Sequence, residues 1–325
     1  MIRGAAADDG GDRSAAGPRV VGLLGPTGVG KTAVALELAR LFGVRVISCD
    51  SMQVYSGFPV LTNQPSAAEL AVVRHELVGF VPPDESFSAV QYAGLARPPI
   101  TEDLARAGRA LLVGGTGLYM RAALAPLAAP VEADPSLRAE LEARAAAEGP
   151  GALHAELAAR DPDAALRIDP RNVRRVVRAL EAVLLTGRAW SGRDDLWAPE
   201  YDHPTTVVGL VMERAELYRR IDARASAIVA GGAVEEVRRF REEVGSTAGA
   251  PGGPGIRSAI GYPEICAHLD GERSLDETVA LVAAATRRYA RRQLTWLRKL
   301  RDAVIIDVQG RDPRGVAEQV ADLVS

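Results

Sequence analysis

The stretch "GPTGVGKT", residues 25–32, is the most informative segment of this sequence. It follows the apolar run "RVVGLL" (19–24) and leads into the helical pattern "AVALELARLF" (33–42). Its spacing is G-x-x-x-x-G-K-[ST], and a strand before it and a helix after it are the context that a phosphate-binding loop requires. The glycines let backbone N–H groups surround phosphate oxygens, Lys31 adds a positive charge, and the Thr32 hydroxyl can hold Mg²⁺. The segment therefore predicts a phosphate-binding site, but it does not indicate which molecule carries the phosphate.

Composition limits the class of protein. A chain of 325 residues, 47% of them hydrophobic, can bury one large core or a core plus a smaller unit. The formal charge of -3 argues against coating nucleic acid through bulk charge. Two cysteines make no disulfide framework, and four scattered histidines lack the spacing of a zinc site. We expect a cytoplasmic protein without a membrane segment or secretory signal, and with a disordered tail over residues 1–17.

The order of apolar segments predicts an α/β protein. Strands are expected at 19–24, 44–51, 110–115, 205–212 and 302–308, and they form a parallel sheet with helices on both faces, a three-layer P-loop core. Residues 126–199 lack strand signals and repeat Ala, Leu, Arg and Glu at helical spacing, so they predict an inserted all-helical domain. The core would then comprise residues 18–125 and 200–325. The segment at 245–255 predicts a flexible loop, and Pro98–Pro99 predict a break in the helix around them.

A carboxylate at the end of a later strand is the usual companion of a triphosphate-binding loop, because it holds Mg²⁺ or orients water. Here the strand at 110–115 ends in glycines and Thr116, which weakens a kinase or ATPase interpretation without excluding it. Asp50 and Asp307 end other apolar runs. Asp50 follows the second strand, and ligands of open α/β sheets bind outside such strand ends, so we expect it to face the loop. The alternative is that Asp50 only caps the turn that follows it.

Six blocks in this order resemble the tRNA dimethylallyltransferases, also called tRNA isopentenyltransferases. They are "GPTGVGKT", "ISCDSMQVYSG", "LLVGGTGLYMRAAL", "ELYRRIDARASAIVAGG", "AIGYPEICAHLDGERSLDE" and "TRRYARRQLTWLRK", from about residue 19 to about residue 299. In that family a P-loop core with a helical insertion transfers a dimethylallyl group from its diphosphate to the N6 amine of an adenosine beside the anticodon. The resemblance implies the bacterial type without a zinc finger. It also implies that the diphosphate is held by Gly25, Pro26, Thr27, Gly28, Val29, Gly30, Lys31 and Thr32.

The resemblance also implies three catalytic residues. Asp50 matches the general base, which is useful because an exocyclic adenine amine is a poor nucleophile. Arg224 matches an arginine that stabilises the departing diphosphate together with Lys31 and Mg²⁺ at Thr32. Thr116 matches a threonine beside the reacting groups. Without the resemblance, Arg224 would be taken for a surface arginine paired with Asp222 or Glu216, and Thr116 for the end of a strand.

Two basic clusters predict contact with RNA on this acidic chain. The first contains Arg171, Arg174, Arg175 and Arg178 at helical spacing; the second contains Arg287, Arg288, Arg291, Arg292, Arg298, Lys299 and Arg301. The alternative is that these are solvated helix faces paired with glutamates. The resemblance places contacts with the tRNA anticodon stem-loop at Asp50, Ser51, Met52, Gln53, Thr116, Arg138, Arg174, Arg175, Arg178, Ser258, Gly261 and Tyr262. The target adenine must leave the base stack of the anticodon loop. The pocket therefore needs two openings, one for each substrate. We expect a monomer.

Some segments depart from the family pattern. "GFPVLTNQP" (57–65) and "RHELVG" (74–79) replace the family's usual residues, and Ser258 stands where glutamine is common. The first two lean toward a sister family, the adenylate isopentenyltransferases, which prenylate free AMP, ADP or ATP. The open alternatives are therefore such an adenylate enzyme, a P-loop kinase or ATPase, and a non-catalytic RNA-binding module.

Overall fold

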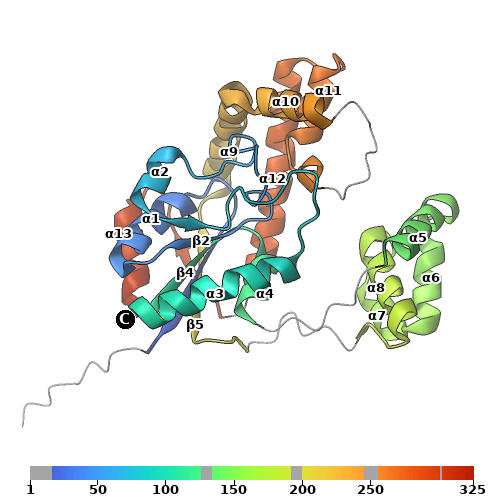
Figure 1. Cartoon of the computed structure of the whole chain (residues 1–325), viewed down its shortest axis with the longest axis horizontal. Coiled ribbons are helices and arrows are strands. Elements are labelled where there is room, and N and C mark those ends of the chain that lie inside the picture. The colour runs from blue at the N-terminus through green and yellow to red at the C-terminus, as the bar shows by residue number, and fades with distance from the viewer. Residues whose placement is uncertain (1–16, 126–133, 192–199, 245–254, 301) are drawn as a thin grey trace, which may run out of the picture. The chain divides into compact units, whose positions relative to one another are not determined.

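The computed structural model describes residues 17–125, 134–191, 200–244, 255–300 and 302–325. The chain divides into two compact units, one made of residues 1–124 and 201–325 and the other of residues 125–200 (Figure 1). The tail predicted over 1–17 and the loop predicted over 245–255 lie, apart from their last residues, outside the described residues. In the described ranges, no helix combines the length and the hydropathy needed to cross a bilayer.

The larger unit is built on a parallel sheet in the order β3-β2-β4-β1-β5-β6. The strands are β1 (Arg19–Leu24), β2 (Val46–Cys49), β3 (His75–Glu76), β4 (Arg109–Gly114), β5 (Thr205–Val211) and β6 (Val304–Asp307). The predicted α/β fold is confirmed, and all five predicted strands are present. The strand β3 was not predicted, because two residues at a sheet edge carry no alternating pattern. Strands from both ends of the chain share this sheet, so residues distant in sequence meet at its carboxyl edge.

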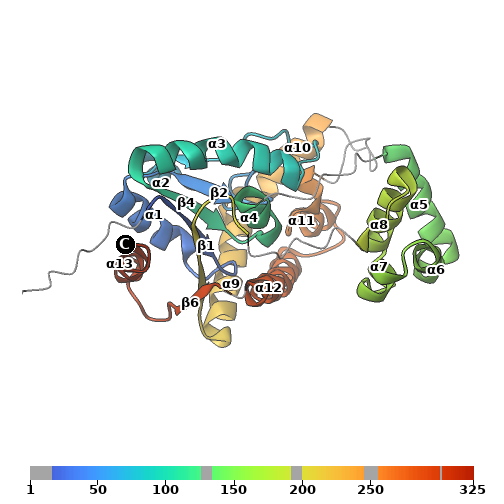
Figure 2. The ribbon, with the colours of Figure 1, turned by 90° about the horizontal axis from the view of Figure 1, so that it is seen from below.

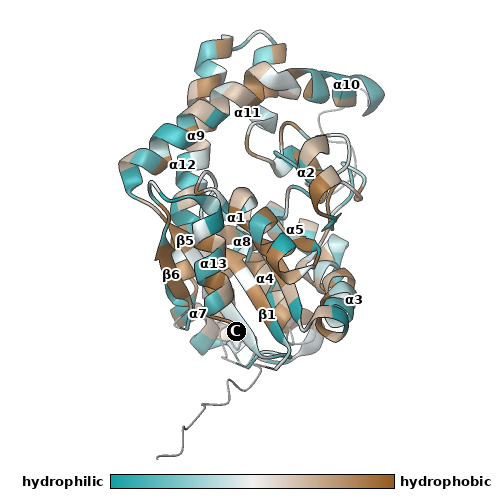
Figure 3. Ribbon diagram, turned by 90° about the vertical axis from the view of Figure 1, so that its left-hand side faces the viewer, coloured by the Kyte–Doolittle hydropathy of each residue, from teal (hydrophilic) through white to brown (hydrophobic). Residues whose placement is uncertain are grey.

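Alternate side chains of each strand point to opposite faces, which requires a helical layer on each side. In the described part of this unit the α-helices are α1 (Lys31–Phe42), α2 (Ala67–Val72), α3 (Ala89–Ala107), α4 (Gly117–Leu124), α9 (Arg214–Ile228), α10 (Val234–Val244), α11 (Tyr262–Leu269), α12 (Leu275–Lys299) and α13 (Pro313–Asp322). Val20 and Leu24 of β1 pack under the helix α3, whereas Val21 and Leu23 pack on the other face. Figure 2 shows α3 along one face of the sheet, with α1 and α13 on the other. Figure 3 shows β6 as a mainly hydrophobic strand and α10 as a mainly hydrophilic helix.

The helix α3 corrects one prediction, since it runs unbroken through Pro98 and Pro99. Each proline removes an N–H donor and leaves one carbonyl of the preceding turn without its helical partner. Those carbonyls belong to Gly94 and Leu95, which are exposed to solvent, so water can satisfy them. The helix starts at a capping box in which Ser88 and Gln91 bond each other's backbone N–H groups. The two prolines therefore do not break this helix, because it is well capped and its buried face packs on the sheet.

The smaller unit consists, in its described part, of α5 (Pro135–Glu148), α6 (Pro150–Arg160), α7 (Pro162–Arg167) and α8 (Val173–Thr186). Three of these helices begin with proline, which is favoured there because its fixed φ suits the first turn and no N–H partner is needed. Their apolar faces form a separate core that includes Leu141, Leu153, Leu157, Val176 and Leu180. Residues 125–200 thus have a hydrophobic core of their own.

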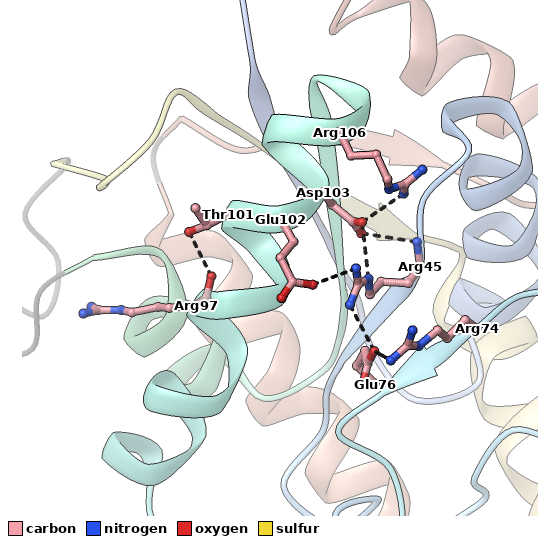
Figure 4. Close-up of polar contacts among 8 residues, drawn as sticks. All are labelled: Arg45, Arg74, Glu76, Arg97, Thr101, Glu102, Asp103 and Arg106. Atoms are coloured by element: carbon pink, nitrogen blue, oxygen red, sulfur yellow. Dashed lines mark hydrogen bonds and ion pairs between the residues drawn. The ribbon is translucent and has the colours of Figure 1, made fainter.

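An ion-pair network fastens α3 to the start of β2 (Figure 4). Asp103 is completely buried, and its carboxylate accepts hydrogen bonds from the backbone N and Nε of Arg45, both at 3.3 Å, and from Arg106 at 2.9 Å. Arg45 also pairs with Glu76 at 3.2 Å and with Glu102 at 2.9 Å. Arg74 adds a further pair with Glu76 at 2.8 Å.

Replacing Asp103 by alanine should therefore lower the free energy of unfolding by about 2–3 kcal/mol, because three donors lose a buried charged partner. Chemical denaturation measures this change. The matched control is Glu102→Ala, which removes a mostly exposed partner of the same arginine and should cost about 0.5 kcal/mol or less. Equal losses in the two variants would contradict the account.

Candidate active site

The loop between β1 and α1 has the conformation that phosphate binding needs. Gly28 and Gly30 adopt φ values of 90° and 102°, a left-handed region that side chains with a Cβ avoid. Lys31 Nζ donates to the carbonyls of Gly25 at 2.9 Å and of Pro26 at 3.0 Å. Enclosure of the ammonium lowers the pKa of Lys31 to about 8, and the nearby Asp50 carboxylate partly opposes that shift. The lysine is therefore held inside the loop by weak neutral acceptors that an anion can replace.

Asp50 lies directly after β2, at the same sheet edge as the loop. Its Oδ1 accepts from the backbone N of Met52 at 2.9 Å and of Gln53 at 3.4 Å, so the carboxylate does cap the turn that follows it. Its Oδ2 accepts no hydrogen bond from any residue that the structure describes. The Asp50 carboxylate can thus both cap the turn and act as a base. Oδ1 fixes its orientation, and Oδ2 is free to accept a proton.

Two pockets meet at Asp50. The first, the loop pocket, has a volume of about 270 Å³ and is lined by loop residues together with Gln53, Asn63, Arg220 and others. The second, the inner pocket, has a volume of about 190 Å³ and a largely apolar wall that includes Met52, Leu61, Ile228 and Val282. The residues that line both pockets are Thr27, Asp50 and Arg224. A ligand in one pocket and a ligand in the other would therefore meet beside the same carboxylate.

Arg224 on α9 is directed into the site and not into a surface pair. Glu216, its proposed alternative partner, pairs with Arg219 and Arg220, both at 2.7 Å, and Asp222 pairs with Arg287. In the described part of the chain, Arg224 forms no salt bridge. Burial lowers the pKa of Arg224, an effect that the nearby Asp50 opposes. A largely buried guanidinium that lines both pockets is placed to receive negative charge.

Thr116 follows β4 and joins that strand end to the turn at Asp50. Its Oγ1 accepts from the backbone N of Ser51 at 3.1 Å, and its own backbone N donates to the Cys49 carbonyl at 3.2 Å. Burial raises the pKa of Tyr289 to about 12, against the lowering effect of a hydrogen bond with Thr116. Thr116 thus fixes the segment around Asp50.

The segment that departs from the family pattern lies at this site. Leu61 and Thr62 line the inner pocket, and Asn63 lines the loop pocket. The buried carboxylate of Glu236 on α10 accepts from the backbone N of Val60 and of Leu61, both at 2.8 Å. Glu236 was not predicted, because nothing in a run of surface-like glutamates distinguishes the one that folds inward.

The predicted contact residues Ser258, Gly261 and Tyr262, at the end of the 3₁₀ turn Gly255–Ser258 and just after it, differ in how they face the site. Ser258 lines the inner pocket, and its hydroxyl donates to the Gly255 carbonyl at 2.9 Å. Gly261 has a φ of 100°, and a Cβ there would lie 2.8 Å from Leu61 Cδ1. Tyr262 is only 8% exposed, and its ring packs edge-on against Phe58 and Phe240, so this side chain supports the wall of the site from behind.

The basic residues of the smaller unit also differ from one another. Arg174 and Arg175 are exposed on α8, whereas Arg171 precedes the helix and pairs with Asp169 at 2.9 Å. Arg138 and Arg178 meet at the buried carboxylate of Glu181, at 2.7 and 2.9 Å. The ion pair between Arg138 on α5 and Glu181 on α8 therefore connects these two helices.

The basic block on α12 has two faces. Arg288, Arg291 and Arg298 are exposed, as are Arg292 and Lys299. Tyr289 and Arg292 line the inner pocket, and the buried Gln293 accepts from the backbone N of Thr27. The sequence predicts only a charged block here, and Gln293 was not predicted, although the spacing of 289, 293, 296 and 297 is that of one helix face.

The donor set in the loop pocket fits a magnesium ion. The exposed hydroxyl of Thr32 and the carboxylate of Asp50 line the same pocket, and both present oxygen, the element that Mg²⁺ prefers. Among the described residues there is no group of three or more His, Cys, Asp or Glu side chains that could hold a metal alone. A magnesium ion here would need oxygen ligands from a bound phosphate and from water as well.

Comparison with known proteins gives one consistent result. The sequence matches the family described as IPP transferase over residues 53–300, and the family described as isopentenyl transferase over residues 18–78. It is 44% identical over 290 residues to the tRNA dimethylallyltransferase of Thermomicrobium roseum, covering 89% of this chain and 86% of that one. It is also 44% identical over 303 residues to that of Anaeromyxobacter dehalogenans, covering 93% and 99%. The crystal structure of the tRNA isopentenylpyrophosphate transferase of Bacillus halodurans is similar, with a TM-score of 0.68, 36% identity, and coverage of 94% and 97%.

The lowered pKa of Lys31 predicts proton-linked anion binding. In the free protein Lys31 loses its proton as the pH rises through about 8, and a bound pyrophosphate favours the charged form. Binding of pyrophosphate above pH 8 should then be accompanied by proton uptake on Lys31, and this contribution to affinity should fall as the pH rises further. Calorimetry in buffers of different ionisation enthalpy measures this uptake. In the control Lys31→Arg the side chain stays charged, so equal uptake by this variant and the wild type would contradict the assignment.

Proposed function

Because the chain belongs to the tRNA dimethylallyltransferase family, we propose that it transfers a dimethylallyl group from dimethylallyl diphosphate to the N6 amine of an adenosine next to the anticodon of tRNA. The product is N6-isopentenyladenosine in the tRNA. The observation that carries the proposal is the meeting of two pockets at Thr27, Asp50 and Arg224. A two-substrate transfer needs this arrangement, since donor carbon and acceptor nitrogen must approach within contact distance.

The donor is placed with its diphosphate in the loop pocket and its five-carbon chain toward the apolar wall of the inner pocket. When the allylic C–O bond breaks, positive charge grows on the allyl group and negative charge on the diphosphate. Lys31 and Arg224 face that growing negative charge with the loop amides. Enclosure lowers the pKa of both side chains, so an arriving anion stabilises their charged forms. Magnesium held by Thr32 would neutralise further charge on the diphosphate, which leaves Oδ2 of Asp50 free for the proton.

The acceptor is placed in the inner pocket, with its amine near Oδ2 of Asp50. The nitrogen forms a bond to the allylic carbon as the C–O bond breaks, and a proton passes from nitrogen to the carboxylate. The adenosine must leave the anticodon-loop stack to expose this edge. Met52, Leu61, Ile228 and Val282 exclude water, which would otherwise capture the allyl group. Thr116 keeps the Asp50 turn in place through Ser51.

The exposed arginines provide surfaces for the RNA backbone. On the smaller unit these are Arg174 and Arg175, beside the Arg138 and Arg178 pair on Glu181; on α12 they are Arg288, Arg291 and Arg298. Phosphate contacts of this kind position an RNA without reading its sequence. The protein would act in the cytoplasm, and the expectation of a monomer stays a prediction.

A free adenylate is the main alternative acceptor, suggested by the altered segment at 57–65, which lines both pockets. It is not favoured, because the relatives that match nearly the whole chain are tRNA enzymes and a free nucleotide needs no exposed basic surface. A kinase or ATPase is disfavoured by the apolar wall beside Asp50, which suits an isoprenoid chain. A non-catalytic RNA-binding module is disfavoured as well, because it would not need two enclosed cations, Lys31 and Arg224, beside a phosphate-binding loop.

Labelled dimethylallyl diphosphate tests the proposal when it is offered with Mg²⁺ and either undermodified tRNA or AMP. We expect label in tRNA and none in AMP. Label in AMP alone would favour the adenylate enzyme, phosphate release from ATP would favour the kinase class, and tRNA binding without transfer would favour the binding module.

The variant Asp50→Asn belongs in the same experiment. Its amide oxygen can still accept from Met52, so the turn is retained while the proton acceptor is lost. Transfer should fall about 10²- to 10⁴-fold, with tRNA affinity changed by about threefold or less. A near-normal rate would remove Asp50 from the mechanism.

A further inference from the structure

Gln293 is the buried polar side chain that joins α12 to the loop pocket. Its side chain lies between the first strand's loop and the end of β4, and the residue is only 6% exposed. Oε1 accepts from the backbone N of Thr27 at 2.8 Å, and Nε2 donates to the Gly115 carbonyl at 3.1 Å. Both ends of one amide are therefore used to hold two separate backbone segments at a fixed distance.

The helix is seated against those segments by glycines. A Cβ at Gly115 would lie 1.9 Å from Gln293 Nε2, and one at Gly117 would lie 2.6 Å from the ring of Trp296. One turn further, a Cβ at Gly209 of β5 would lie 2.6 Å from Leu297. Real Cβ atoms do not approach so closely, so only glycine permits this contact. The close seating fixes the height of α12 above the sheet and brings the Gln293 amide within reach of Thr27.

Thr27 is the residue through which this contact reaches the chemistry. It belongs to the phosphate-binding loop and lines both pockets. Its N–H is committed to Gln293, so this amide does not face a ligand and the path of the loop around residue 27 is determined from outside the loop. Loss of the acceptor would leave a partly buried N–H without its partner, which favours other loop conformations.

We propose that Gln293 is a positioning residue, which sets the shape of the diphosphate loop from the helix that carries the exposed arginines. The inward face of α12 holds Tyr289 at the inner pocket and Gln293 at the loop, while Arg288 and Arg291 lie exposed on the same turns. One rigid element then supports the donor site and presents the basic surface to RNA. The inference rests on the proposed function, since it assumes that the loop binds the diphosphate of the donor.

The test measures the affinity of the full-length protein for inorganic pyrophosphate with Mg²⁺, and separately for an anticodon stem-loop RNA. Gln293→Met keeps the length of the side chain and removes both hydrogen bonds. We expect its pyrophosphate affinity to fall about tenfold, because a misplaced Thr27 disorganises the loop amides, and its stem-loop affinity to change by about twofold or less. In transfer assays KM for the diphosphate should rise while KM for tRNA stays near that of the wild type.

Two further variants separate positioning from general stability. Gln293→Glu can still accept from Thr27 but sets a carboxylate against the Gly115 carbonyl and near the anion, so its pyrophosphate affinity should fall below that of Gln293→Met. Thr295→Ala is the matched control on the exposed face of the same helix, where it also loses one side-chain hydrogen bond, to Arg291. It should keep wild-type affinity for both ligands.

Pyrophosphate affinity in Gln293→Met within twofold of the wild type would overturn the inference. So would equal losses for pyrophosphate and stem-loop that track a lowered melting temperature, since these would indicate a structural role only. If the wild type itself fails to bind pyrophosphate, the proposed donor site is wrong and the inference falls with it, whereas transfer activity with an insensitive Gln293 rejects the inference alone.

Discussion

The site depends on the attraction between one carboxylate and two enclosed cations. Asp50 opposes the fall in the pKa of Lys31 and of Arg224 that their enclosure causes. The carboxylate therefore favours the charged forms of both side chains in a poorly solvated space before any substrate arrives. The parallel pairing of β2 with β4 and of β4 with β1 makes this possible, because it brings three strand ends to one edge of the sheet. In the proposed mechanism, positive charge for a leaving diphosphate and a proton acceptor for the amine are therefore assembled in advance.

Packing around that edge explains why the arrangement is stable. Backbone segments approach each other where glycine allows it, as at Gly114, where a Cβ would lie 2.0 Å from the Cys49 carbonyl. Thr116 then connects the β4 end to the Asp50 turn, and Gln293 connects the phosphate-binding loop to α12. Glu236 holds the segment at Val60 and Leu61 in the same way from the other side. Each connection gives a buried or partly buried backbone N–H its partner and also positions the wall of a pocket.

The sequence predicts those parts of the molecule whose signal is local. Strand β1, the loop and α1 form one continuous motif, and Asp50 follows directly from its place after an apolar run. Arg224 required the family resemblance, because its own surroundings read as an exposed helix with nearby acids. Glu236 and the pairing of Arg138 and Arg178 on Glu181 were not predictable, since each depends on contacts between segments far apart in the chain or on which side of a helix turns inward. The helical spacing of Gln293 could have placed it on an inward face, but its contacts with Thr27 and Gly115 join segments far apart in the chain. The unbroken α3 shows the same limit, because exposure of the carbonyls before Pro98 and Pro99 is decided by packing and not by the prolines.

The most direct test of the central claim is a crystal structure of the protein with Mg²⁺, an unreactive thio analogue of dimethylallyl diphosphate and an anticodon stem-loop. The account predicts the diphosphate on the amides of residues 28–32, and the N6 amine of an unstacked adenosine within hydrogen-bonding distance, about 3 Å, of the free oxygen of Asp50. An adenine bound elsewhere, or an Asp50 carboxylate directed away from the amine with the donor in place, would contradict it.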